Sequence, residues 1–185
     1  MTSLFAQAGK SGSTRSTVLR ACLPVLVGTA LLALSAHVQV PFWPVRLSMQ
    51  TFVVVMLGLA YGPALATATV LAYVAQGAAG LPVFQGGAGP AYIVGPTGGY
   101  LLGFVVAVQV AGRASTRGFR GAFSAVTLVT AAIYVLGVAW LAVLFGFEKA
   151  VAFGLTPFVG GELLKMLLAV ALAPLAARVR DRIGG

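Results

Sequence analysis

The 185-residue sequence is 59% hydrophobic and 8% charged, and its formal net charge is +9. Soluble domains carry about 25% charged residues, so this composition predicts an all-α integral membrane protein whose apolar runs are long enough to cross a bilayer. The arginines flank those runs and form no stripe, which argues against nucleic-acid binding. One cysteine, Cys22, and one histidine, His37, exclude an intrachain disulfide and a metal site built from these residue types.

A chain of this length supplies about six membrane-spanning helices of roughly 20 residues each. We expect a polar cytoplasmic tail over residues 1–17 and one six-helix membrane domain over residues 18–185. The first span is predicted from about Val18 to Val40. This run is longer than the hydrophobic region of a signal peptide, which is the competing interpretation.

Small residues mark one face of this first span. Thr29 and Ala33 have the four-residue spacing that lets helices approach closely, and Ala30 lies beside them. Such a surface is as typical of packing within the chain as of docking to another protein.

The segment after the first span contains two prolines, Pro41 and Pro44, on either side of Phe42 and Trp43. Prolines this close together do not fit inside a helix, and tryptophan favours the membrane–water interface, so an ordered external turn is predicted. Arg46, Gln50 and Thr51 follow. They are typical of interfacial anchoring and a helix start, which we favour here, or of a lid over a site.

Two short spans come next, from about Leu47 to Tyr61 and from about Ala64 to Ala79, separated by a Gly62-Pro63 turn. The segment from Gly80 to Phe104 then holds eight of the 24 glycines and three of the nine prolines. Irregular backbone near membrane depth persists only where protein or a water-filled cavity satisfies its amides. This segment is therefore either a ligand cradle or a flexible connector.

Aromatic and amide side chains interleaved with these glycines favour the wall of a pocket, and they are Phe84, Gln85, Tyr92 and Tyr100. The segment is not a phosphate-binding loop, because it contains no GxxxxGK[ST] pattern and no lysine. No ATP-binding motif occurs elsewhere in the sequence.

The last three spans are predicted over about 98–112, 122–147 and 157–177, with Glu148 and Lys149 in the turn before the last one. Six spans with a cytoplasmic N-terminus leave nine basic residues on the cytoplasmic side and two, Arg46 and Lys149, outside. This positive-inside bias predicts that both termini are cytoplasmic. The nine are Lys10, Arg15, Arg20, Arg113, Arg117, Arg120, Arg178, Arg180 and Arg182.

The run TPFVGGELLKMLL places Glu162 and Lys165 inside the last apolar span. Residues three apart share one face of a helix, and an intramembrane charge costs a few kcal/mol, so it normally faces a partner, a cavity or a ligand. The pair is interpreted as a binding site opening outward. The alternative is a structural ion pair that only holds helices together.

Four motifs resemble the BioY family, the biotin-binding S components of energy-coupling-factor (ECF) transporters, and in chain order they are MQTF, GLPVF, GPTGGYLLGF and TPFVGGELLK. The resemblance implies a six-helix fold that captures biotin outside the cell, and partners comprising a transmembrane T component and two cytoplasmic ATPases. The chain departs from the family pattern at Glu162, where aspartate is usual, and at Thr29, where an Ala-x-x-x-Ala pattern is usual.

The resemblance and the residue patterns together give a candidate substrate site without cofactor or metal, in a transporter subunit that is not itself an enzyme. The carboxylate of Glu162 is expected to accept from a ureido N–H, and Lys165 to donate to the ureido carbonyl or to the tail carboxylate. The alternatives are a partner-independent homo-oligomeric biotin facilitator and a membrane enzyme using Glu162. The candidate residues are Glu162, Lys165, Phe84, Gln85, Tyr92, Thr97, Gly98, Tyr100 and Gln50.

Overall fold

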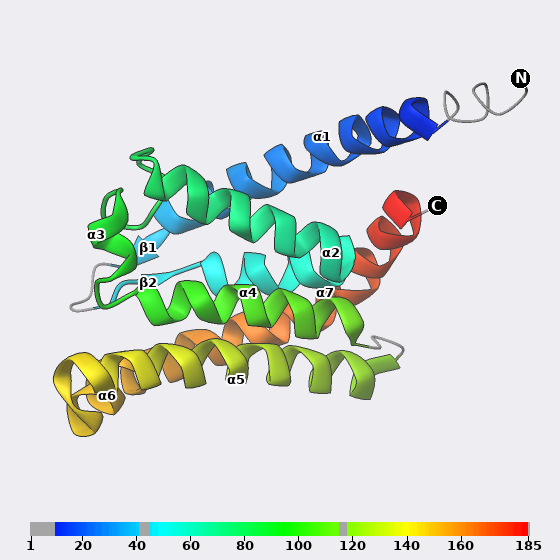
Figure 1. Ribbon diagram of the computed structural model, residues 1–185. Coiled ribbons are helices and arrows are strands. Elements are labelled where there is room, and N and C mark those ends of the chain that lie inside the picture. Colours follow the sequence, from blue (N-terminus) through cyan, green and yellow to red (C-terminus); the bar gives the residue numbers. More distant parts are fainter. Residues whose placement is uncertain (1–9, 41–44, 115–117, 185) are drawn as a thin grey trace, which may run out of the picture.

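The computed structural model describes residues 10–40, 45–114 and 118–184, and these are almost entirely helical. Figure 1 shows the arrangement, in which the only strands among the described residues are β1 and β2, paired antiparallel. The elements are α1 (Lys10–His37), β1 (Gln39–Val40), β2 (Leu47–Ser48), α2 (Gln50–Ala78), α3 (Pro90–Ile93), α4 (Gly98–Arg113), α5 (Gly118–Phe145), α6 (Phe147–Gly154), the 3-10 helix η1 (Thr156–Phe158) and α7 (Val159–Gly184).

Three helical stretches of the described chain are long and apolar enough to cross a membrane, which agrees with the predicted all-α membrane class. They are Gln50–Ala78, Gly118–Phe145 and Phe147–Ile183. Cys22–His37 and Gly98–Arg113 are shorter apolar helices.

Helix α2 is a helical hairpin. Gly62 has φ 72° and ψ 175°, a conformation that residues with a side chain rarely adopt, and Pro63 follows it. The amide of Gln50 donates to the hydroxyl of Tyr73 at 2.7 Å, although 23 residues of continuous helix would hold them about 34 Å apart. The turn predicted at Gly62-Pro63 is therefore confirmed, and the two short predicted stretches are the two halves of α2.

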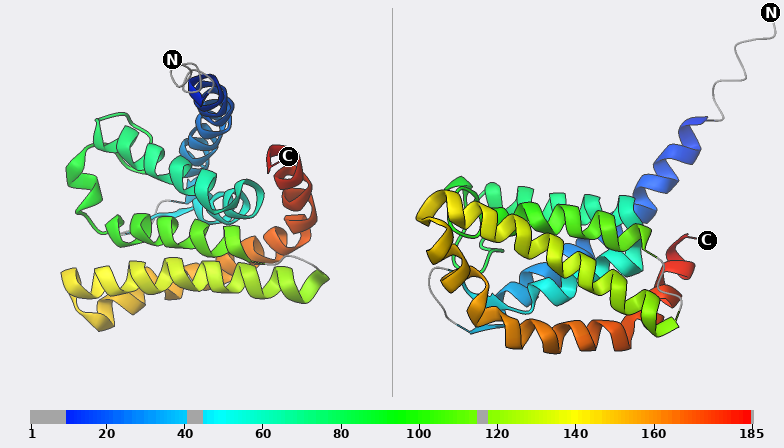
Figure 2. Two further views of the ribbon diagram at one scale, coloured as in Figure 1. Left: turned by 45° about the vertical axis from the view of Figure 1, so that its right-hand side comes forward. Right: turned by 90° about the horizontal axis from the view of Figure 1, so that it is seen from below.

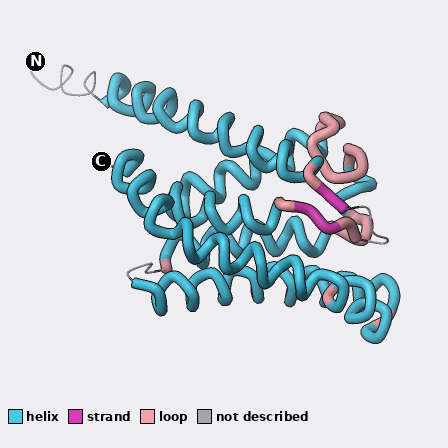
Figure 3. The backbone as a smooth tube through the Cα atoms, turned by 180° about the vertical axis from the view of Figure 1, so that it is seen from behind, coloured by secondary structure: helices cyan, strands magenta, loops and turns pink. Residues whose placement is uncertain are grey.

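The ends of the molecule differ in character. The start of α1 and the end of α7 lie at one end of the bundle, and β1, β2, α3 and α6 lie at the other (Figures 1 and 2); Figure 3 shows the two strands at that far end from behind. Helix α4 packs between α2 and α5, and α7 packs against α2 and α5. The first part of α1 diverges from the bundle (Figure 2). The strands, α3 and α6 thus gather at the end opposite to the start of α1 and the end of α7.

Several predicted boundaries shift. Helix α1 already begins at Lys10, inside the stretch assigned to the tail, and residues 1–9 and 41–44 lie outside the described part of the chain. The fifth helix ends at Phe145 because Gly146 has φ 85°. Glu148 lies in helix α6, so its assignment to a turn was wrong.

The small-residue surface of α1 is divided between two faces. Thr29 is 3% exposed and receives a weak 3.5 Å hydrogen bond from the amide of Gln76 in α2, whereas Ala30 is exposed. Gly28 packs so closely on Thr69 that an added Cβ would lie 2.5 Å from its methyl group. The buried position of Thr29 agrees with packing within the chain, the first of the two interpretations of this surface.

Candidate functional site

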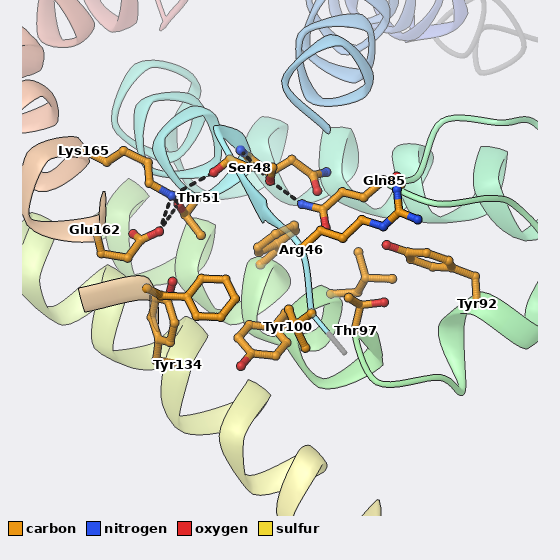
Figure 4. A pocket seen from close by; sticks show the side chains of 15 residues that line it. Arg46, Ser48, Thr51, Gln85, Tyr92, Thr97, Tyr100, Tyr134, Glu162 and Lys165 are labelled. Carbon is orange, nitrogen blue, oxygen red and sulfur yellow. Dashed lines mark hydrogen bonds and ion pairs between the residues drawn. The ribbon is translucent and has the colours of Figure 1, made fainter. Parts of the chain in front are cut away.

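A pocket opens at the end of the bundle that carries β1, β2 and α3. Its empty space, counted out to its open mouth, is about 430 Å³. Figure 4 shows Glu162, Lys165 and Thr51 at one end of the pocket and Arg46, Gln85 and Tyr92 at the other, with Ser48 between them and the rings of Tyr100 and Tyr134 along one side. The lining residues are Val45, Arg46, Ser48, Gln50, Thr51, Gln85, Tyr92, Thr97, Tyr100, Leu101, Phe104, Tyr134, Phe158, Glu162 and Lys165.

One end of the pocket is a buried ion pair between Glu162 and Lys165, one turn apart on α7. Their side chains are 8% and 12% exposed, and they are in direct hydrogen-bonding contact. Thr51, at the start of α2, donates to Glu162 Oε1 at 2.9 Å. The hydroxyl of Tyr134 adds a contact to the same carboxylate. The expectation that the acid and the base share one face is confirmed.

The donors of Lys165 are fully used. Its Nζ donates to the carbonyl of Ser48 at 2.8 Å and to Thr51 Oγ1 at 2.9 Å, in addition to Glu162. An ammonium has three N–H groups, so none is left for a ligand in this arrangement. A carboxylate accepts about four hydrogen bonds, so Glu162 keeps acceptor capacity toward the pocket.

The other end of the pocket carries a cation with donors to spare. Arg46 is exposed, and its Nη1 donates to the carbonyl of Gln85 at 3.1 Å. A guanidinium has five N–H donors, so Arg46 retains donors for an anion. The side-chain amide of Gln85 donates to Ser48 Oγ, which links the two ends of the site.

Tyr92 forms the wall beside Arg46. Its ring stacks on Phe84 with centroids 4.7 Å apart, and its hydroxyl contacts Thr97. Partial burial raises the pKa of Tyr92, so its phenol stays protonated and remains a hydrogen-bond donor at neutral pH.

Gln50 ties the hairpin of α2 to the glycine-rich segment. Its amide donates to the Tyr73 hydroxyl, which donates in turn to the carbonyl of Val83 at 2.9 Å. Gln50 is 4% exposed and lines the pocket, so this chain of hydrogen bonds fixes one wall.

The apolar middle of the pocket contains the rings of Tyr100, Tyr134 and Phe158. Tyr100 and Tyr134 meet edge to face with centroids 5.8 Å apart. The Tyr100 hydroxyl donates to the carbonyl of Gly154 at 2.6 Å, so it joins α4 to the end of α6. The Tyr100 ring lies against Gly137, where an added Cβ would be 2.4 Å from Cε1.

Replacing Gly137 with alanine is expected to destabilise the protein by about 1–3 kcal/mol, because the methyl group would overpack the Tyr100 ring. Gly160→Ala is the matched control: this residue is exposed on α7, nothing lies within 4 Å of its added Cβ, and alanine favours a helix. Thermal unfolding in detergent compares them. An equal or higher melting temperature for G137A would contradict the packing argument.

Most of the predicted site residues meet around the pocket. Those in its lining are Gln50, Gln85, Tyr92, Thr97, Tyr100, Glu162 and Lys165. Phe84 and Gly98, the other two candidates, are not in it, so the prediction that Phe84 forms part of the wall is corrected. Phe84 is 2% exposed and fills the space left by Gly77, behind Tyr92. Gly98 packs against the carbonyl of Ile93, where a side chain does not fit.

Several lining residues were missed or assigned another role. Arg46 and Thr51 had been interpreted as interfacial anchors, and only the MQTF motif pointed to the segment after Arg46. Tyr134 and Phe158 lie within apolar runs, where an aromatic residue gives no signal of a pocket.

Among the described residues, no group of three or more His, Cys, Asp or Glu side chains is placed to hold a metal ion.

Comparison with known proteins shows the family to which this chain belongs. Residues 8–182 match the BioY family. The chain belongs to the BioY family. The match extends from the first turns of α1 to the end of α7, so all the elements that form the pocket belong to the BioY domain.

Relatives of this BioY chain come from distant organisms. A probable biotin transporter BioY of Pyrococcus horikoshii is 39% identical over 80% of this chain and 91% of the relative. The biotin transporter BioY of Thermotoga maritima is 34% identical over 84% and 94%. A crystal structure of the S-component for biotin from an ECF-type ABC transporter has the same fold, with a TM-score of 0.72, 23% identity and coverage of 90% and 93%.

Proposed function

We propose that this chain captures biotin outside the cell and carries it across the cytoplasmic membrane as the S component of an ECF-type transporter. The names of the BioY relatives support the substrate. The observation that carries the proposal is the pair of opposite polar ends of the pocket: a buried carboxylate with acceptor capacity at one end and an arginine with spare donors at the other.

Biotin has matching ends. Its ureido ring carries two N–H donors and a carbonyl, its bicycle is apolar, and its tail ends in a carboxylate. We place the ureido ring at Glu162, which accepts one N–H, and the bicycle among the rings of Tyr100, Tyr134 and Phe158. The tail carboxylate then pairs with Arg46 in a charge-assisted bond. Lys165 orients Glu162, since its own donors are used.

The chain crosses the membrane six times in this proposal, through α1, the two halves of α2, α4, α5 and α7, within the membrane domain of residues 18–185. The start of α1 and the end of α7 lie at one end of the bundle. Placing that end in the cytoplasm agrees with the nine basic residues on this side against two on the other. The pocket then opens to the outside.

The sequence has no ATP-binding motif, so energy for uptake comes from another polypeptide or from the biotin gradient, and the proposal adopts the first of these. The proposed partners are a coupling T component and two cytoplasmic ATPases. The outward face of α1 supports a docking role, since Leu23, Leu26 and Leu34 are 60–68% exposed and Ala30 lies among them.

Titration calorimetry of the purified protein with biotin tests the proposal. We expect saturable binding of one biotin per chain. Pantothenate, which also ends in a carboxylate but has no ureido ring, is the matched control and is expected not to bind. No heat of binding with biotin, or equal affinity for both compounds, would contradict the proposal.

A further inference from the structure

A second hollow lies on the outer face of the bundle, between α5 and α7. It encloses about 600 Å³ out to its open side, and its surface is almost wholly apolar. A neighbouring hollow shares Ala131, Tyr134 and Leu155 with it and continues along α5 toward α6. We call the two together the lateral groove. Its lining is Thr127, Thr130, Ala131, Tyr134, Val135, Val138, Ala139, Phe147, Val151, Leu155, Phe158, Val159, Glu162, Leu163 and Met166.

The lateral groove faces the bilayer in a membrane-embedded chain. Val135, Val159 and Leu163 are 66%, 50% and 56% exposed along it. Its α5 side runs from Thr127 to Ala139, which is about 18 Å of helix. One leaflet contributes about 15 Å of hydrocarbon, so the groove extends over about the depth of a leaflet.

Three residues line both the lateral groove and the polar pocket: Tyr134, Phe158 and Glu162. The ring of Phe158, 4% exposed, meets the ring of Tyr134 with centroids 5.9 Å apart and an interplanar angle of 62°. A partition only one side chain thick therefore separates the two spaces.

Polar groups lie on the pocket side of this partition, and the side that faces the lateral groove is apolar. The head of Glu162 is held by Thr51 and Lys165 within the bundle. Because the groove surface is almost wholly apolar, Glu162 presents its methylene stem to it. A carboxylate facing hydrocarbon without its partners is costly, so the rings keep lipid away from the ion pair.

We infer that Phe158, braced by Tyr134, is the specificity-determining partition of this site: it shields Glu162 from the bilayer and limits the apolar bulk that a ligand carries on this side. Removal of the ring joins the pocket to the lateral groove. The site then admits ureido-ring compounds with an apolar substituent that extends between α5 and α7. The shielding of Glu162 by Phe158 is inferred from geometry alone. The limit that Phe158 sets on the ligand rests on the proposed binding of biotin.

Carbodiimide labelling tests the shielding without any ligand. Dicyclohexylcarbodiimide partitions into membranes, adds to a carboxylic acid across one C=N bond, and rearranges to a stable N-acylurea with no leaving group. We expect Phe158→Ala to raise labelling of Glu162 at least fivefold over wild type, measured by mass spectrometry of the peptide that contains it. Glu162→Gln gives the background.

Phe104→Ala is the matched control, because Phe104 is also 4% exposed and lines the pocket but not the lateral groove. It enlarges the pocket by the same ring without opening it to the bilayer, so labelling is expected to stay near the wild-type level. Phe158→Leu repeats the test if the alanine variant unfolds. Equal labelling in the Phe158 and Phe104 variants would overturn the partition.

Ligand discrimination tests the second part. Biotin carrying a benzyl group on one ureido nitrogen retains one N–H for Glu162. We expect the ratio of its affinity to that of biotin to rise at least tenfold in F158A and not in F104A. Unchanged ratios alongside raised labelling would overturn the specificity role, whereas failure of the wild type to bind biotin would overturn the proposed function and leave the labelling result standing.

Discussion

Glutamine at position 162 is expected to weaken biotin binding by about 10- to 100-fold. A hydrogen bond to a charged group contributes about 1.5–3 kcal/mol, which corresponds to this range. The amide keeps the shape of the side chain and one acceptor, but it loses the charge. It also brings two N–H donors that face a ureido N–H or the ammonium of Lys165. Titration calorimetry on E162Q and wild type measures the difference.

The same substitution also affects stability, because it leaves the ammonium of Lys165 buried without its carboxylate. Breaking a buried pair by removing one partner costs about 3–5 kcal/mol, so the melting temperature of E162Q is expected to fall. Glu148→Gln is the matched control, since Glu148 is exposed on α6 and does not line the pocket. Unchanged biotin affinity in a folded E162Q would show that the pair is only structural.

Substitutions of Arg46 and of Lys165 are expected to differ in their effect on the preference for a ligand with a charged tail. Wild type should bind biotin at least tenfold more tightly than biotin amide, whose tail is neutral. Arg46→Gln should remove most of this preference by weakening biotin alone, because Arg46 has free donors at the tail end of the pocket. Lys165→Met should weaken both compounds alike, because its donors hold Ser48, Thr51 and Glu162.

Arg46→Lys serves as the matched variant, since it keeps the charge and is expected to restore part of the preference while losing the two-pronged geometry of a guanidinium. Binding is measured by competition for both ligands in all variants. The reverse pattern, with the preference lost in K165M and kept in R46Q, would assign the tail carboxylate to Lys165.

Spacing along one helix predicted the central feature of this site. Glu162 and Lys165 lie three residues apart, so their shared face followed from helix geometry and did not depend on the rest of the fold. Their partner Thr51 lies 111 residues from Glu162 along the chain, and no local pattern connects the two. Arg46 was interpreted as an interfacial anchor, with a lid over a site as the alternative, whereas its hydrogen bond to the carbonyl of Gln85 places it beside the pocket.

Aromatic residues were the least predictable part. Phe84 and Tyr92 occur in the same glycine-rich segment, yet one fills the space beside Gly77 and the other faces the pocket. Sequence does not distinguish them, because their difference depends on the path of a distant helix. The predicted end of a helix was wrong where a single glycine took a positive φ, as Gly146 does between α5 and α6.

The unequal helices give the molecule an uneven hydrophobic thickness. Helix α4 has 16 residues and α5 has 28, so their axial lengths are about 24 and 42 Å. A hydrocarbon core about 30 Å thick is too deep for the first and too shallow for the second. In the proposed six-span arrangement, the surrounding bilayer thins along one flank while α5 tilts along the other, at a cost of fractions of a kcal/mol per Å of mismatch. The length of the lipid chains is therefore expected to influence the tilt of this protein in the membrane.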